Sequence, residues 1–276
     1  MLWWKLLLTP VMIGALTLIG RRWGPRAAGL IVGLPLTTGP VSVFLAREQG
    51  TAFAARAAIG SVVGFMNACC CVAVFALTLR RRSVFASVAS AIAVVAISSV
   101  TFGELDLSMP VAFGISAIAI VVLWRVVRQP SLGAVDGGRA VPRGQGPTSA
   151  WDLPARMLIA TAMVAGTTAA ATLLGSRMSG VLSALPILGG LLAIFTQQRE
   201  GRDAAVSLVA AMIIGSLPGI LFFAVVHALV QRAPLATAYG TATLIAMLLG
   251  LLISTVTRPR RPAALPEAPA TLHKAA

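Results

Sequence analysis

Charged side chains are scarce in this sequence of 276 residues. Asp, Glu, Lys and Arg make up 11% of it, whereas soluble domains carry about 25%. So few charges cannot cover a water-facing surface. Hydrophobic residues account for 58%, and apolar runs of about 20 residues, the length that crosses a bilayer, recur along most of the chain. The sequence therefore predicts an all-α fold, a polytopic bundle of helices in a membrane.

Acidic residues are especially few: the chain has 8 Asp and Glu, and none lies near the middle of a predicted membrane span. A carboxylate in mid-membrane is the usual carrier of a proton or sodium ion, so tight coupling to a cation is disfavoured. The chain has only 2 histidines and lacks the motifs of phosphate-binding loops and hydrolases. We therefore predict no catalysis, metal or cofactor, and a lipid-modifying enzyme is the weakest alternative.

The three cysteines are consecutive, Cys69 to Cys71. On a helix, neighbouring side chains point about 100° apart, so the three thiols cannot converge on one metal ion. We interpret them as small apolar side chains within a membrane helix.

Apolar runs predict nine spans, which the loops divide into four parts. The parts are an N-terminal membrane repeat of five spans (1–128), a cytoplasmic linker (129–152), a C-terminal membrane repeat of four spans (153–257) and a disordered cytoplasmic tail (258–276). The spans are residues 3–20, 27–46, 57–79, 83–102, 108–124, 157–175, 178–197, 204–229 and 234–256.

Basic residues predict the orientation, because loops rich in Lys and Arg stay in the cytoplasm. With nine spans, 17 of the 22 Lys and Arg lie on the side of the linker and C-terminus, and 5 lie on the other. This bias predicts a bacterial inner-membrane protein with its N-terminus outside. The net charge of +14 then fits a lipid bilayer as partner, and it needs no nucleic acid.

An internal repeat relates the two halves at an offset of 151 residues. Residues 24–50 align with residues 175–201 without gaps, and the register continues to Gly64 and Gly215. The matches include Gly and Pro pairs, whose backbone roles other residues cannot imitate. Because five spans separate each element from its mate, the repeats must be inverted, as in many secondary transporters.

Prolines and glycines interrupt the second span and its mate at similar depths. Such breaks free backbone polar groups, which must face protein or a wet cavity. Two breaks in opposite directions would present helix ends to one pocket, whereas the alternative is kinks that allow close helix packing. Including a polar residue of the third span, the predicted substrate-binding residues are Pro35, Thr37, Thr38, Gly39, Pro40, Asn67, Pro186, Gly189 and Gly190.

Two polar residues outside the breaks have open interpretations. Asn67 lies in the middle of the third span, where it could contact a ligand or form a hydrogen bond between helices. His227 lies toward the outer end of the eighth span, where a structural role is favoured over a proton relay.

The stretch from Ala28-Gly29-Leu30 through Leu34-Pro35 to Glu48-Gln49-Gly50 resembles the small GlpM-like bacterial membrane proteins. It covers about 25 residues, and this chain departs from that family in its length and internal duplication. The resemblance implies a link to exopolysaccharide production without a defined biochemical activity.

Together these features predict a transporter or permease for a small neutral, zwitterionic or anionic solute. The competing hypothesis is a non-transporting accessory protein in envelope or exopolysaccharide assembly, in which the broken helices serve packing.

Overall fold

The computed structural model describes residues 38–102, 107–129 and 187–256 continuously, together with scattered residues between 14 and 31 and residues 158 and 162. Every secondary-structure element in these ranges is an α-helix. The all-helical prediction is thus confirmed for this part of the chain. The predicted spans 3–20 and 157–175, most of the linker and the tail lie outside the described residues.

The helices follow the predicted spans closely from the third span to the fifth and again in the ninth. Four helical stretches are long and apolar enough to cross a membrane: Thr51–Leu79, Met109–Arg128, Arg202–Leu229 and Leu235–Val256. The helices are α3 (Thr38–Gln49), α4 (Thr51–Leu79), α5 (Val84–Phe102), α6 (Met109–Arg128), α9 (Ile187–Glu200), α10 (Arg202–Gly215), α11 (Leu217–Leu229) and α12 (Leu235–Val256).

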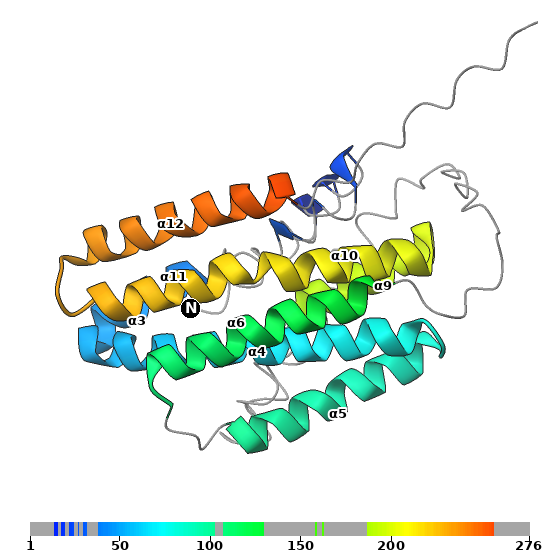
Figure 1. Cartoon of the computed structure of the whole chain (residues 1–276), viewed down its shortest axis with the longest axis horizontal. Helices are drawn as coiled ribbons and strands as arrows, with labels where there is room; N and C mark the ends of the chain where they lie inside the picture. The colour runs from blue at the N-terminus through cyan, green and yellow to red at the C-terminus, as the bar shows by residue number, and fades with distance from the viewer. Residues whose placement is uncertain are drawn as a thin grey trace, which may run out of the picture.

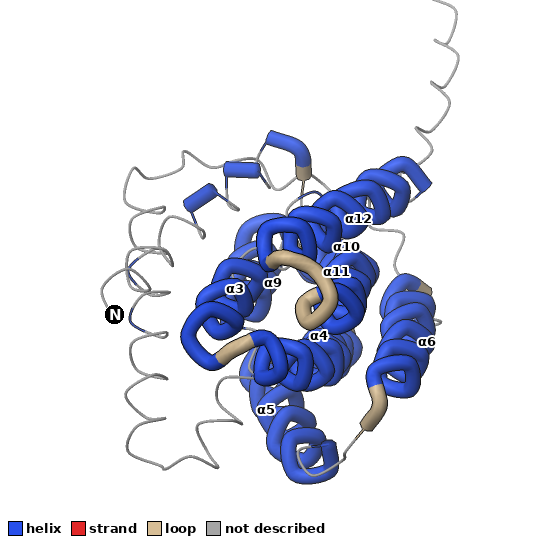
Figure 2. Tube along the Cα trace, turned by 90° about the vertical axis from the view of Figure 1, so that its left-hand side faces the viewer, coloured by secondary structure: helices blue, strands red, loops and turns tan. Residues whose placement is uncertain are grey.

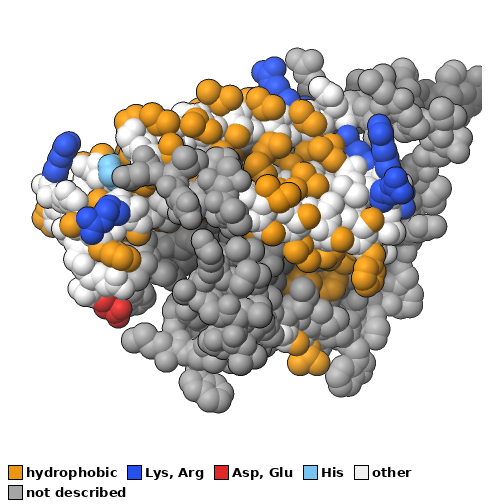
Figure 3. Space-filling view, turned by 90° about the horizontal axis from the view of Figure 1, so that it is seen from below, with side chains coloured by type: hydrophobic (Ala, Val, Ile, Leu, Met, Phe, Trp, Pro, Cys, Tyr) orange, Lys and Arg blue, Asp and Glu red, His pale blue; other side chains and the backbone are white. Residues whose placement is uncertain are grey.

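Large apolar side chains cover the outside of the bundle. Ile118 on α6 is 68% exposed and Leu251 on α12 is 61% exposed. Each such side chain would cost about 1.5–3 kcal/mol in water relative to an apolar medium. In Figure 3 the apolar surface lies between two ends that carry the Lys and Arg side chains. This distribution fits a protein embedded in a membrane.

Two glycines turn the chain between consecutive helices. Gly50 joins α3 to α4 with φ +88°, and Gly201 joins α9 to α10 with φ +92°. In each turn the amide of the alanine four residues on donates to the glycine carbonyl, Ala54 at 3.2 Å and Ala205 at 3.3 Å. The two glycines are 151 residues apart, so aligned positions have the same local geometry.

The same offset relates the starts of the following helices. Thr51 begins α4 and Arg202 begins α10. Val84 begins α5 and Leu235 begins α12. The offset therefore continues past the segment that sequence alignment detects, into α5 and α12.

Helix α4 runs in the opposite direction to α10 and α11. In Figure 1, α4 runs from left to right, and α10 with α11 runs from right to left. These helices pack against each other, and Figure 2 shows them surrounded by α3, α5, α6, α9 and α12. We call the two ends of the bundle the Gly50 end and the Gly201 end.

The predicted span 204–229 is interrupted in the structure, where α10 ends at Gly215 and α11 begins at Leu217. Pro218 cannot donate a backbone hydrogen bond. The Ser216 hydroxyl donates to the Met212 carbonyl at 2.9 Å, a bond that bends helices. The predicted span thus consists of two helices within one stretch of membrane length, Arg202–Leu229. By contrast, α4 continues through Asn67, the mate of Pro218.

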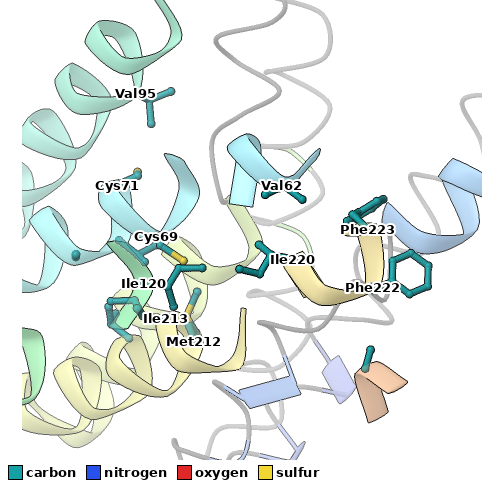
Figure 4. Close-up of a cluster of buried hydrophobic side chains, with 14 of the residues drawn as sticks. Val62, Cys69, Cys71, Val95, Ile120, Met212, Ile213, Ile220, Phe222 and Phe223 are labelled. Atoms are coloured by element: carbon teal, nitrogen blue, oxygen red, sulfur yellow. The ribbon is translucent and has the colours of Figure 1, made fainter. Parts of the chain in front are cut away.

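The centre of the core is the crossing of α4 with α10 and α11. A Cβ atom on Gly219 would lie 2.8 Å from the Phe65 ring, so only glycine allows this approach. Cys69 lies against Ser216, and Figure 4 shows it among Ile213, Met212 and Ile220. Cys69 and Cys71 are buried and Cys70 is half-buried.

Candidate functional site

Two helices, α3 and α9, end at opposite ends of the bundle. α3 ends at the Gly50 end and α9 at the Gly201 end (Figure 1). The first described residues of these helices, Thr38 and Ile187, directly follow residues outside the described ranges. The breaks expected before them therefore stay predictions from the sequence.

The C-terminal end of each of these helices carries a basic residue. The last turn contains an arginine, Arg47 in α3 and Arg199 in α9. These arginines stabilise the negative C-terminal ends of the helix dipoles.

The predicted site residues of the first break are only partly described. Thr38 begins α3 and is exposed, and Gly39 is buried with the Phe222 ring 3.5 Å from its ideal Cβ position. Pro40 occupies the third position of α3. Pro35 and Thr37 lie outside the described residues.

Of the second break, the structure describes only the residues that follow Pro186. Gly189 is buried and Gly190 is half-buried in the first turn of α9. A Cβ on Gly190 would meet no described atom within 4 Å. Pro186 lies outside the described residues, one position before α9 begins.

Asn67 is buried in the middle of α4, and its side-chain oxygen accepts a hydrogen bond from the Ser98 hydroxyl of α5. The Ser98 hydroxyl also approaches the Val94 carbonyl at 2.6 Å. This geometry matches the predicted hydrogen bond between helices. The structure does not bring Asn67 into contact with Thr38, Gly39, Gly189 or Gly190 among the contacts it describes.

A buried polar pair that sequence reasoning missed joins α3 to α12. The Tyr239 hydroxyl lies 2.9 Å from the Ser42 hydroxyl and donates to the Ser42 carbonyl at 3.0 Å. The Tyr239 ring lies 6.1 Å from the Phe222 ring, centroid to centroid. Tyr239 is the one tyrosine of the sequence, a signal that could have pointed to it.

A separate pocket of about 350 Å³ opens at the Gly50 end. His227 of α11 lines it, and its Nδ1 lies 2.8 Å from the Ala55 carbonyl. Because a carbonyl only accepts, Nδ1 carries the proton. This bond ties α11 to α4, in agreement with the favoured structural role of His227. The pocket is lined by Ala55, Met109, Pro110, Ala224, His227, Ala228, Gln231 and Arg232.

No family model, curated protein or solved structure matches this chain. The resemblance to GlpM-like proteins stays a prediction. Among the described residues, no group of three or more His, Cys, Asp or Glu could hold a metal ion.

Proposed function

We propose that this protein is a transporter of the bacterial inner membrane, built from two inverted repeats with nine spans in total. Its substrate would be a small neutral, zwitterionic or anionic solute. The repeats would comprise α3 to α5 and α9 to α12, in which α10 starts 151 residues after α4 and α12 starts 151 residues after α5. Inverted repeats of this kind place a substrate site between them, near the middle of the membrane.

The observation that carries the proposal is the pair of matching glycine turns at opposite ends of the bundle. Gly50 and Gly201, 151 residues apart, follow α3 and α9 with similar backbone angles, and the sequence predicts a break in the span before each turn. Helices interrupted in mid-membrane occur where they face protein or a water-filled cavity. Two opposed N-termini at such a cavity would bind the carboxylate or phosphate of a substrate.

The distribution of charge limits the substrate. Described charged side chains lie within about two turns of a helix end, as in Arg56 of α4 and Arg125 of α6. No described charge could neutralise a polyvalent cation in the interior, so an uncharged, zwitterionic or anionic solute fits better.

The arginine distribution supports the proposed orientation. From α3 to α12, the Gly201 end carries seven described arginines and the Gly50 end carries three. The richer end would face the cytoplasm, which would put the N-terminus outside and the C-terminus inside. The larger set is Arg80, Arg81, Arg82, Arg125, Arg128, Arg199 and Arg202, and the smaller set is Arg47, Arg56 and Arg232.

Solute flux in proteoliposomes tests the proposal. A panel of radiolabelled amino acids, sugars and organic acids would be compared between the unmodified protein and the variants Thr37→Val/Thr38→Val and Pro186→Ala. We expect flux of at least one solute, lowered about tenfold or more in each variant. Thr255→Ala, which removes an exposed hydroxyl of α12, is the control and should transport normally.

Absence of flux across the whole panel, or equal flux in all variants, would contradict transport through this site. The accessory role in envelope or exopolysaccharide assembly would then be the better account.

A further inference from the structure

Five arginines gather where α4 and α6 end, at the Gly201 end. Three follow one another after α4 (Arg80 to Arg82), and two lie in the last turn of α6 (Arg125 and Arg128). The Arg80 guanidinium donates to the Val127 carbonyl, so the two helix ends lie side by side. This bond satisfies a free carbonyl at the end of α6 and makes the arginines one cluster.

The sequence on both sides of this cluster is free of acidic residues. It has no Asp or Glu in residues 49–103 or 107–135. The described acids at this end, Glu200 and Asp203, lie at the junction of α9 and α10. Arg81, Arg82, Arg125 and Arg128 are exposed, so the cluster presents positive charge outward.

The N-terminus of α5 adds to the cluster, because α5 begins two residues after Arg82. Ser83 caps this helix by accepting a hydrogen bond from the Ala86 amide at 3.3 Å. The positive end of the α5 dipole thus adjoins Arg81 and Arg82.

Aromatic side chains flank the arginines at the same depth. Phe85, in the first turn of α5, is 90% exposed. Trp124, near the end of α6, lies beneath the Arg128 guanidinium at 5.0 Å from the ring centroid. Aromatic residues in this position are typical of the zone of lipid headgroups.

Apolar surface continues from the cluster along α5 and α6. Both helices pack on α4 and make little contact with each other, and Figure 2 shows them on different sides of α4. Their exposed side chains include Ile92 and Ile97 on α5 and Ile118 and Val122 on α6. Acyl chains can lie against these two faces below a headgroup held by the arginines.

We infer that this cluster is a binding site for an anionic phospholipid with two phosphates, a lipid of the cardiolipin type. Arginine forks bind phosphate oxygens in pairs. Arg81 and Arg82 beside the α5 N-terminus can hold one phosphate, and Arg125 and Arg128 the other. The inference concerns a lipid site away from the proposed substrate site, and it stands whether or not the protein transports.

Native mass spectrometry of the full-length protein in detergent, titrated with cardiolipin, phosphatidylglycerol or phosphatidylcholine, tests the inference. We expect cardiolipin to bind about tenfold more tightly than phosphatidylglycerol, with phosphatidylcholine weakest. We expect each of two double variants to weaken cardiolipin binding about tenfold, because each removes the arginines that hold one of the two phosphates. The variants are Arg81→Gln/Arg82→Gln and Arg125→Gln/Arg128→Gln. Arg80 stays unchanged in both variants because it bonds to Val127.

The matched control is Arg47→Gln/Arg232→Gln, which removes two charges from the Gly50 end and should change cardiolipin binding less than twofold. Elution volume and melting temperature would identify any variant that misfolds. Arg81→Lys/Arg82→Lys would then replace it, and this variant should also weaken cardiolipin binding because it loses the arginine forks. Equal weakening by the control would overturn the site, as would equal binding of the three lipids. Displacement of the lipid by millimolar inorganic phosphate would also overturn it, in favour of a site for soluble phosphate.

Discussion

Individual glycines govern the two turns that join α3 to α4 and α9 to α10. Gly50 and Gly201 adopt φ near +90° with extended ψ, a region that side chains with a Cβ rarely occupy. The alignment of the sequence paired these glycines but could not give their backbone angles, because glycine also serves in close packing.

We expect Gly50→Ala and Gly201→Ala each to lower the free energy of unfolding by ~1–3 kcal/mol, through strain at positive φ. The measurement is denaturant unfolding in detergent micelles, followed by circular dichroism. Gly60→Ala is the control, because Gly60 lies within α4 and a Cβ there has open space. A stability change as large in the control as in the turn variants would contradict the assignment of strain.

Gly219 is required for a different reason, the contact of α11 with Phe65. We expect Gly219→Ala to destabilise by ~1–3 kcal/mol, because the new methyl group would overlap the ring. Phe65→Leu should recover part of this loss in the double variant, since it removes the ring edge. Additive effects of the two substitutions in thermal unfolding would show that the residues do not press on each other.

At the scale of elements, hydrogen bonds within the membrane join helix to helix. Asn67 and Ser98 connect α4 to α5, and Ser42 and Tyr239 connect α3 to α12. Such bonds contribute about 0.6 kcal/mol on average and up to about 1.7 kcal/mol. They order the helices more than they stabilise them.

A double-mutant cycle tests the role of Asn67 as a helix link. Asn67→Ala and Ser98→Ala should each destabilise by ~0.5–1.5 kcal/mol, and the double variant by less than the sum. Unfolding in micelles gives these values, with Thr255→Ala as an exposed control. If Asn67→Ala left stability unchanged and raised the KM for a transported solute, Asn67 would contact substrate instead.

The sequence predicted the long helices well and the interruptions less well. Apolar length and flanking arginines placed α4, α6 and α12 within a few residues, because these helices need only span the bilayer. The division of α10 from α11 was missed, although Pro218 was visible in the sequence. Its effect depends on the Ser216 hydroxyl and on the crossing with α4, and neither follows from local pattern.

The candidate site was predicted in part. Alignment identified Gly39, Gly189 and Gly190 as special positions, and these lie in the first turns of α3 and α9. Ser42 and Tyr239 were not identified, because they are 197 residues apart and their contact depends on tertiary packing.

At the scale of the whole molecule, α4 runs opposite to α10 and α11, and the arginines distinguish the two ends of the bundle. Single cysteines at the ends test the proposed orientation in a background in which Cys69, Cys70 and Cys71 are replaced by alanine. In intact cells, Arg232→Cys should react with a membrane-impermeant maleimide, and Arg82→Cys should react only after the membrane is opened. The reverse pattern would place the arginine-rich end outside.

Water access to the residues beside the two predicted helix breaks tests the central claim most directly. In the same background, Thr38→Cys and Gly190→Cys would be exposed to a small membrane-impermeant thiol reagent from either side of sealed vesicles of known orientation. Ser87→Cys, at a fully buried position on α5, is the unreactive control. A transporter with its site between the two predicted breaks predicts labelling of both cysteines from both sides, slowed by a transported solute. Labelling from neither side would show packed helices without a cavity and would contradict the account.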